Sequence, residues 1–384
     1  MSYSLKIPSN VYAGDGSTKE LAEILEKEKT KKVLLFTDDG VKANGLCDHA
    51  IEILESKKVP YVIFTGLKPE PSWQDVTEVV DRAAKEDGDL IIAIGGGSVM
   101  DAAKLVALLK GSDYTVKDLL KNPKIATKQV KCVFCPTTCG TGSEATCNAI
   151  VAIPEEQSKQ GIVNDSMIPE YVILDTDMIK NLPAKIVAAT GVDALAHCVE
   201  CYTSNKATSL SDVYAIAGAK LIFHNIEKAY SDPKDVDARR AMLMGAFYGG
   251  VAITGSGTTA VHALSYPLGG KYHIAHGVSN AILLAHVMRF NEDAIIDRLA
   301  SLCDNVYPEL SQKSLKEKAD YIIERIAEIV KNTEIPTDLS GYGVTMEDLD
   351  FLVDAGSKQT RLLVNNKKEL SLDDIRNIYL KVLK

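Results

Sequence analysis

The first half of the chain alternates short apolar runs with amphipathic stretches of helical periodicity. The apolar runs are rich in Val and Ile, as are strands that are buried on both faces of a sheet. Strands that alternate with helices pair in parallel, because each helix carries the chain back across the sheet. The pattern therefore predicts a doubly wound parallel sheet, with strands within residues 31–40, 59–66, 88–98, 129–138 and 170–178.

The pattern changes near Leu182–Pro183. From Lys185 onward almost every segment has helical periodicity, for example 211–230 and 314–333. We therefore expect an α/β plus all-α architecture, with a doubly wound α/β nucleotide domain over residues 1–182 and a helical domain over 183–384. Ligands of open α/β sheets bind beyond the carboxyl ends of the strands, so the active site is expected in the cleft between the domains.

Charge and composition exclude several classes of partner. A net charge of −9 argues against nucleic acid, and no apolar run approaches the ~20 residues that span a membrane. The start "MSYSLKIPSN" lacks the features of a signal peptide, so the eight cysteines are expected to be reduced thiols in the cytoplasm. We interpret the two CxxC spacings, at 132–135 and 198–201, as incidental.

One apolar run leads directly into three glycines and a helix, in "GDLIIAIGGGSVMDAAKLVALL". Gly96 and Gly97 allow the backbone to approach a ligand closely. Ser98 and the helix amino terminus then offer N–H groups to an anion such as a pyrophosphate. The strand-end residue Asp38 suits a ribose diol and would repel a 2′-phosphate, which favours NAD over NADP. A tight turn without ligand is the alternative for the glycines.

A second small-residue loop, "PTTCGTGSEAT" at residues 136–146, also follows a predicted strand. Its hydroxyls and free backbone N–H groups suit a ribose or a phosphate. A polar β-turn is the alternative, and the density of Thr, Ser and Gly favours a ligand loop.

Asp193 and His197 lie one helical turn apart in "GVDALAHCVE", so both face the same side of a helix. By spacing alone a buried Asp–His hydrogen bond and half a metal site are equally good interpretations. His262 and His276 lie further along, and Pro267, Gly269 and Gly270 are expected to break any helix between them. One carboxylate and three imidazoles would hold a divalent ion and leave room for a substrate oxygen.

These motifs, in this order, resemble the iron-containing (group III, metal-dependent) alcohol dehydrogenases. The resemblance rests on "IPSNVYAGDGS", "GGGSVMDAAK", "PTTCGTGSEAT", "LPAKIVAATGVDALAHCVECY" and "HALSYPLGGKYHIAHGVSNAILLAHVMRFN". It implies a homodimer or larger assembly and a metal, Fe²⁺ first and Zn²⁺ or another divalent ion second. It places the metal on Asp193, His197, His262 and His276. It places the dinucleotide on Asp38, Gly96, Gly97, Ser98, Asp101, Thr137, Thr138, Asn148 and Lys159.

Two departures from the family pattern bear on the chemistry. Many members carry a second histidine where this chain has Tyr266, so Tyr266 or His273 is the candidate proton relay. Glu70 stands where the family often has Asn, and it would contact ribose or face water. The variant "HALSYPLGG…HIAHG" is similar to members that act on short hydroxyacids such as 4-hydroxybutyrate.

The expected activity is therefore hydride transfer between NAD and a small alcohol or short hydroxyacid. Two alternatives stay open on the sequence. One is a dehydroquinate-synthase-like lyase, which shares the metal and the nucleotide loop. The other is a metal- or nucleotide-binding protein without turnover.

Overall fold

A computed structural model describes residues 3–384. Its main sheet has six parallel strands in the order β1-β8-β5-β4-β2-β3. The bounds are β1 (Asn10–Ala13), β2 (Val33–Phe36), β3 (Tyr61–Phe64), β4 (Leu90–Gly95), β5 (Lys131–Pro136) and β8 (Tyr171–Leu174). β2, β4 and β8 are buried along their whole length, as their apolar runs predicted. The predicted parallel sheet is confirmed.

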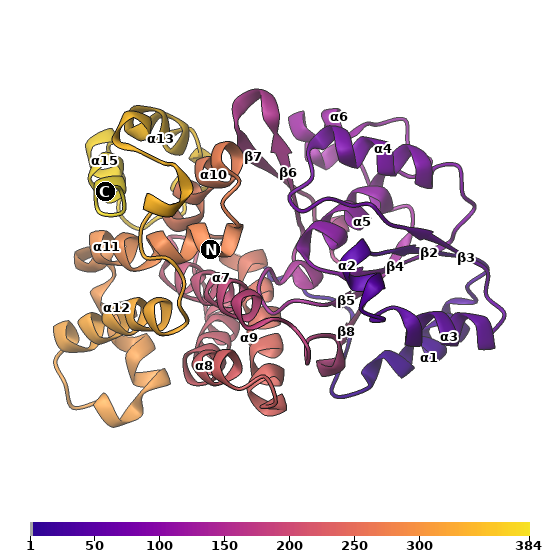
Figure 1. Cartoon of the computed structure of the whole chain (residues 1–384), viewed down its shortest axis with the longest axis horizontal. Helices are drawn as coiled ribbons and strands as arrows, with labels where there is room; N and C mark the ends of the chain where they lie inside the picture. The colour runs from indigo at the N-terminus through magenta and orange to yellow at the C-terminus, as the bar shows by residue number, and fades with distance from the viewer. Residues whose placement is uncertain (1–2) are drawn as a thin grey trace.

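Helices cover both faces of this sheet (Figure 1). Alternate residues of one strand serve different cores, because side chains of a strand point to opposite faces. Leu35 of β2 packs in the core that contains α1 and α3, and Leu34 packs in the core that contains α4 and α5. The helices of this half are α1 (Leu21–Glu28), α2 (Asp39–Ala43), α3 (Asp48–Ser56), α4 (Trp73–Ala83), α5 (Gly97–Leu109) and α6 (Val116–Lys121).

An antiparallel hairpin follows the sheet strand β5 and was not predicted. It consists of β6 (Asn148–Ile153) and β7 (Ser158–Val163), which pair along their full length. Buried and half-buried residues alternate along β6, but its sequence NAIVAI is apolar at every position after Asn148, so no alternation of polar and apolar residues marked it. In Figure 1 the hairpin lies between the sheet and α10 of the helical half.

The chain changes from strands to helices between Leu174 and Ala184. The helices of this half are α7 (Ala184–Thr203), α8 (Ser209–Ser231), α9 (Val236–Ser256), α10 (Ala260–Tyr272), α11 (His276–Val306), α12 (Leu315–Asn332), α13 (Leu349–Ser357), α14 (Thr360–Leu363) and α15 (Leu372–Leu380). The core on one sheet face continues into α7, whose last thirteen residues, from Gly191 to Thr203, are all buried. Among residues 3–384 no helix combines the length and apolarity needed to cross a bilayer.

The expected helix break at Pro267, Gly269 and Gly270 is wrong. α10 continues through all three residues, and the chain turns only after Tyr272, where His273 has a φ of 55°. The two glycines instead allow the β6–β7 hairpin to pack closely against α10. A Cβ on Gly269 would lie 2.5 Å from Lys159 Nζ, and one on Gly270 would lie 2.4 Å from the carbonyl oxygen of Gln157. Close approach of two elements, rather than a turn, explains these glycines.

Candidate metal centre and cofactor cleft

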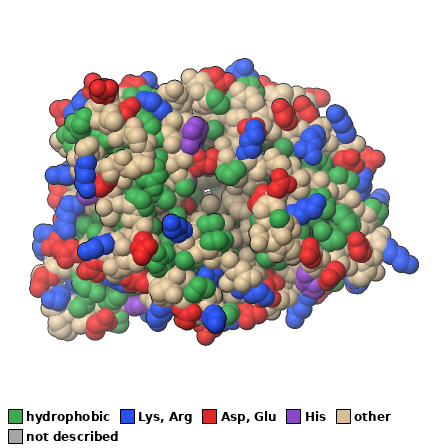
Figure 2. Space-filling view, in the orientation of Figure 1, with side chains coloured by type: hydrophobic (Ala, Val, Ile, Leu, Met, Phe, Trp, Pro, Cys, Tyr) green, Lys and Arg blue, Asp and Glu red, His purple; other side chains and the backbone are tan. Residues whose placement is uncertain are grey.

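A cleft of about 680 Å³ separates the sheet half from the helical half. Its lining comes from both halves, and the space-filling view shows the surface hollowed near its centre (Figure 2). The sheet half contributes Gly97, Ser98 and the β6–β7 hairpin. The helical half contributes Asp193 and the three predicted histidine ligands. A cavity therefore lies at the location predicted from fold principles.

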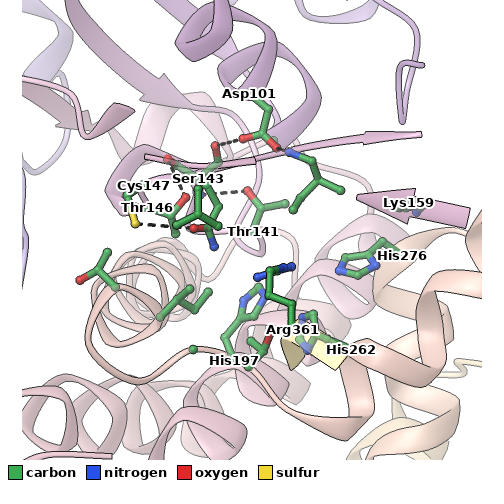
Figure 3. Close-up of a pocket in the computed structure, with 18 of the residues that line it drawn as sticks. Asp101, Thr141, Ser143, Thr146, Cys147, Lys159, His197, His262, His276 and Arg361 are labelled. Carbon is green, nitrogen blue, oxygen red and sulfur yellow. Dashed lines mark hydrogen bonds between the residues drawn. The ribbon is translucent and has the colours of Figure 1, made fainter. Parts of the chain in front are cut away.

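His197, His262 and His276 all line this cleft (Figure 3). Each approaches the same carboxylate oxygen, Oδ1 of Asp193. The Nε2 atom of His197 lies 3.8 Å from Asp193 Oδ1, and the Nε2 atoms of His262 and His276 each lie 3.7 Å from it. Ligand atoms of Asp193, His262 and His276 all lie within 4.8 Å of one another. The His197 ring stacks on the His262 ring with 4.7 Å between centroids.

Four different helical positions supply these side chains. Asp193 and His197 lie one turn apart in the buried part of α7, His262 lies in the first turn of α10, and His276 is the first residue of α11. Gly277 is required beside them, because a Cβ there would lie 2.1 Å from the carbonyl oxygen of Ala189 on α7. α11 can therefore begin directly against α7.

The protonation states of two of the three histidines suit a cation. Burial lowers the pKa of His276 to about 3 and also lowers that of His197. Burial would raise the pKa of Asp193, but the facing histidines outweigh it and hold the pKa below the ordinary value. At neutral pH the carboxylate is therefore ionised and His197 and His276 keep free lone pairs, which is what a divalent metal requires. Burial alone would lower the pKa of His262, but the facing carboxylate of Glu200 outweighs it and raises that pKa, so a metal would displace a proton from this ring. The side chain of His276 is 29% exposed, so the cluster is open toward the cleft.

Glu200 is a buried residue of the cluster that the sequence reasoning missed. Its side chain is fully buried and hydrogen-bonds to Nδ1 of His262. The other carboxylate oxygen accepts from Thr259 N and Val261 N at 2.9 Å each, and from Thr259 Oγ1 at 2.7 Å. With Nδ1 as the donor, Nε2 of His262 presents its lone pair to the cluster. The missed signal is the spacing, because Glu200 follows His197 by three residues on the same face of α7.

Asn280 is a second polar residue of the cluster that was missed. Its Nδ2 lies 2.7 Å from Asp193 Oδ1, 3.2 Å from His262 Nε2 and 3.3 Å from His276 Nε2. Its Oδ1 is buried and has no hydrogen-bond partner within residues 3–384. An orphaned acceptor beside a carboxylate and three imidazoles fits a centre that is completed by a cation.

The glycine turn places a helix amino terminus at the cleft. β4 ends at Gly95 and α5 starts at Gly97, with Gly96 as its N-cap. Gly97 and Ser98 line the cleft. A Cβ on Gly97 would lie 2.8 Å from Thr141 Cγ2, so the glycine also lets the second small-residue loop pack against the first.

Asp101 and Lys104 of α5 tie that second loop to the helix. Lys104 is fully buried and donates to Ser143 Oγ (2.7 Å), Thr146 Oγ1 (3.0 Å), the Asn148 carbonyl oxygen (2.7 Å) and Asp101 Oδ1 (3.2 Å). Asp101 also accepts from Ser143 Oγ at 2.5 Å and from the backbone N–H of Ile150 at 2.9 Å. The predicted residues Asp101 and Asn148 therefore lie at the cleft, and Lys104, which was not predicted, shapes the loop.

Of the other predicted cofactor residues, one lines the cleft and three do not. Lys159 lines the cleft and forms an ion pair with Glu70 at 2.6 Å, so Glu70 faces a lysine rather than open water. Thr138 lies beside Gly96, where a Cβ would be 3.5 Å from its Cγ2, and Thr137 directly precedes it, but neither lines the cleft. Asp38 lies outside the cleft lining and caps α2 by accepting from Val41 N at 2.8 Å.

Comparison with known proteins agrees with this arrangement. Residues 8–176 match the family described as iron-containing alcohol dehydrogenase, and residues 187–383 match the C-terminal part of the Fe-containing alcohol dehydrogenase family. The chain belongs to the iron-containing alcohol dehydrogenases. The resemblance seen in the sequence is thereby confirmed, and the enzyme class is an iron-type alcohol dehydrogenase rather than the lyase or the non-catalytic binding protein.

Relatives of this alcohol dehydrogenase are similar over nearly the whole chain. Long-chain-alcohol dehydrogenase 1 of Geobacillus thermodenitrificans is 34% identical over 97% of this chain and 94% of its own. The NAD-dependent methanol dehydrogenase of Bacillus methanolicus is 31% identical over 90% of this chain and 91% of its own. The crystal structure of a 1,3-propanediol oxidoreductase superimposes with a TM-score of 0.94 at 27% identity and covers 100% of both chains.

The two candidate relay residues of the dehydrogenase lie in different surroundings. Tyr266 is buried in the cleft, with its ring 6.2 Å from that of His276. His273 is exposed and lines a neighbouring cavity of about 440 Å³ together with His276. Burial raises the pKa of Tyr266, and the positive charge of Arg361 opposes this rise. Of the two residues, only Tyr266 lies in the cleft.

Proposed function

We propose that this protein interconverts a small alcohol or short hydroxyacid and its aldehyde or ketone, with NAD as hydride acceptor and a divalent ion, Fe²⁺ foremost. The observation that carries the proposal is the approach of three imidazole Nε2 atoms to within 3.8 Å of Asp193 Oδ1. This cluster lies across the cleft from the glycine turn, so a metal and a dinucleotide would meet there.

Asp193, His197, His262 and His276 would hold the ion. When bound, a divalent cation supplies Lewis acidity, which lowers the pKa of an alcohol hydroxyl and polarises a carbonyl. Asp193 offsets part of the cationic charge. Glu200 keeps Nε2 of His262 free to bind, and Asn280 fixes the carboxylate of Asp193 through its 2.7 Å hydrogen bond. Tyr266 is the proposed proton relay in the cleft, with His273 as the exposed alternative.

The glycine turn and the threonine loop would bind NAD, whose nicotinamide accepts the hydride. The N–H groups at the start of α5 suit the pyrophosphate. Lys159, Asn148 and the loop held by Asp101 line the same cleft as that turn and the metal cluster. Two relatives support the choice of dinucleotide: the methanol dehydrogenase is described as NAD-dependent, and the sulfoacetaldehyde reductase of Bifidobacterium kashiwanohense was crystallised with NAD⁺. That reductase is 27% identical with a TM-score of 0.88 and covers 100% of this chain and 99% of its own.

The preference for NAD over NADP is assigned to the charge of Asp38. Replacing Asp38 by Gly should shift the ratio of kcat/KM values toward NADP by about tenfold, as expected for removal of one repulsive charge. Because Asp38 also caps α2, the matched variant is Asp38→Asn, which keeps a capping oxygen without the charge. If both variants shift the ratio, the charge is responsible. A wild-type preference for NADP would contradict the assignment.

We further propose a cytoplasmic homodimer or larger homo-oligomer. The eight cysteines are all buried and unpaired, as expected of a reducing compartment. β1 is an edge strand of the sheet and offers unpaired backbone groups to a second copy. Light scattering on the purified protein would measure the assembly, and a monomer at micromolar concentration would contradict it.

The function itself is tested by metal reconstitution. Metal-free protein is prepared anaerobically, loaded with Fe²⁺, Zn²⁺ or Mn²⁺, and assayed for NADH formation on a panel of alcohols and hydroxyacids. We expect turnover only with metal and with NAD in preference to NADP. Full activity of the metal-free protein would overturn the proposal, as would absence of turnover across the panel with metal verified as bound.

A further inference from the structure

Arg361 is a cation of the cleft without a carboxylate partner in the described part of the chain. The cleft also contains three carboxylates, and each is engaged elsewhere: Glu70 with Lys159, Asp101 with Lys104, and Asp193 with the histidines. Five other arginines form ion pairs, namely Arg240, Arg289, Arg298, Arg325 and Arg376. Arg239 instead donates to backbone carbonyl oxygens, and Arg82 lies over the ring of Phe64, both away from the cleft. Arg361 is exposed to the cleft and forms none.

The surroundings of Arg361 place its guanidinium between the hairpin and the metal cluster. A Cβ on Gly161 of β7 would lie 2.7 Å from Arg361 Nη2, so the side chain extends from α14 across to the hairpin. Arg361 lines the cleft together with Tyr266 and His262. Figure 3 draws Arg361 beside His197 and His262. The cation therefore lies on the metal side of the cleft rather than at the glycine turn.

We propose that Arg361 binds a carboxylate at the far end of the substrate, so that the natural substrate is a short hydroxyacid or the corresponding aldehyde acid. This inference rests on the proposed function and names its substrate class. A planar guanidinium matches the two oxygens of a carboxylate with paired hydrogen bonds. The hydroxyl end would then reach the metal cluster.

The carboxylate takes no part in the redox step. The carbinol carbon gives its hydride to NAD⁺ and the hydroxyl gives up its proton, so that the hydroxyacid and NAD⁺ yield the aldehyde acid, NADH and H⁺. Arg361 is therefore a specificity-determining residue, and its removal should act on recognition of the anionic substrate more than on that of a neutral one.

The test compares an acid with its neutral isostere. For the Fe²⁺-loaded enzyme, kcat/KM is measured on 4-hydroxybutyrate and 4-hydroxybutyramide, with 1-butanol and an ω-hydroxysulfonate as further arms. We expect the acid to exceed the amide by about tenfold to a hundredfold, the range of a charge-assisted hydrogen bond to a carboxylate. Arg361→Gln should reduce this ratio to about twofold or less, mainly through KM, and Arg361→Lys should restore part of it. If kcat/KM is higher on the ω-hydroxysulfonate than on 4-hydroxybutyrate, the substrate is a sulfonate and the proposed carboxylate class is wrong.

Two further variants separate Arg361 from general cleft charge. Gly161→Ala keeps the arginine but adds a Cβ where Nη2 now lies, so the acid-to-amide ratio should fall while the charge of the cleft is unchanged. Lys206→Gln removes another cation of the same cleft and should reduce the ratio less than Arg361→Gln does. If Lys206→Gln has the larger effect, the anchor is Lys206 and the inference is wrong.

The outcomes also distinguish this inference from the proposed function. Oxidation of neutral alcohols without any preference for acids would overturn the inference and leave the function standing. A rise in KM for NAD, rather than for the acid, in Arg361→Gln would place Arg361 on the cofactor and overturn the inference. Absence of any NAD-linked turnover would overturn the function itself.

Discussion

The two sides of the cleft differ in how their buried polar groups are satisfied. On the sheet side, Lys104 and Asp101 bond to the hydroxyls and backbone of the small-residue loop, and the network is closed within the protein. On the helical side, Asn280 Oδ1 and His197 Nδ1 are buried without partners in residues 3–384, and three imidazoles face one carboxylate. A hydrogen-bond network whose buried polar groups are all paired stabilises the fold. Buried polar groups that lack partners indicate a site for a ligand. Substitutions on the helical side should therefore lower metal binding and activity, and substitutions on the sheet side should lower the free energy of unfolding.

The largest effect is expected at the metal cluster. His276→Ala removes one ligand and should lower kcat/KM by about 1,000-fold or more, because Lewis-acid stabilisation is worth several kcal/mol. The urea midpoint of the metal-free protein should hardly change, and NAD should still bind when followed by fluorescence. His262→Ala should behave alike. If either variant lost much of its stability but kept normal activity, the two sides of the cleft would not differ in the way described.

Lys104→Met should have the opposite profile. Removing the lysine leaves Asp101 and two hydroxyls buried without their donor, so the free energy of unfolding should fall by about 3–5 kcal/mol. Urea unfolding of the metal-free protein measures it. The matched control is Lys110→Met at the end of the same helix, where the lysine is partly exposed. Equal midpoints for the two variants would show that the network does not stabilise the loop.

Glu200→Gln sharpens the comparison within the metal side. Loss of the charge on the group that orients His262 should weaken metal binding by about tenfold to a hundredfold. Competition with a chromogenic chelator gives the Kd directly, without reference to turnover. The control is Glu227→Gln, a carboxylate of α8 paired with Arg325 away from the cleft. An unchanged metal Kd in Glu200→Gln would mean that His262 is held by packing alone.

Glu144 provides a smaller, pH-dependent test on the sheet side. Burial raises the pKa of its carboxyl to about 7. Between pH 4.5 and 7 the folded protein keeps this carboxyl protonated, whereas in the unfolded chain it is ionised. The stability that this group contributes is therefore lost as the pH rises through 7. Glu144→Gln should stabilise the protein by about 2–3 kcal/mol more at pH 8 than at pH 5. The same difference at both pH values would contradict this explanation.

The parts that could be predicted are those with a local signal. Runs such as 33–36 and 90–95 are apolar enough to require burial, and the spacing of Asp193 and His197 fixes a shared helical face. The expected helix break failed because proline and glycine are ambiguous: at Gly269 and Gly270 the glycines serve the approach of the hairpin, which depends on a contact distant in sequence. Likewise, the positions of Arg361 at the cleft and of Asn280 in the metal cluster depend on contacts with residues distant in sequence, which the sequence alone does not indicate. The domain boundary near Leu182–Pro183 and the individual ligand roles stay predictions.

Metal binding measured by calorimetry tests the central claim most directly. Anaerobic titration of the metal-free protein with Fe²⁺ should give one ion per chain and a rise in Tm for the wild type and for Lys110→Met. Binding should be lost or at least about 1,000-fold weaker in His276→Ala, whose urea midpoint is expected to match that of the wild type. Equal binding by His276→Ala and the wild type would contradict the assignment of this cluster as the metal centre.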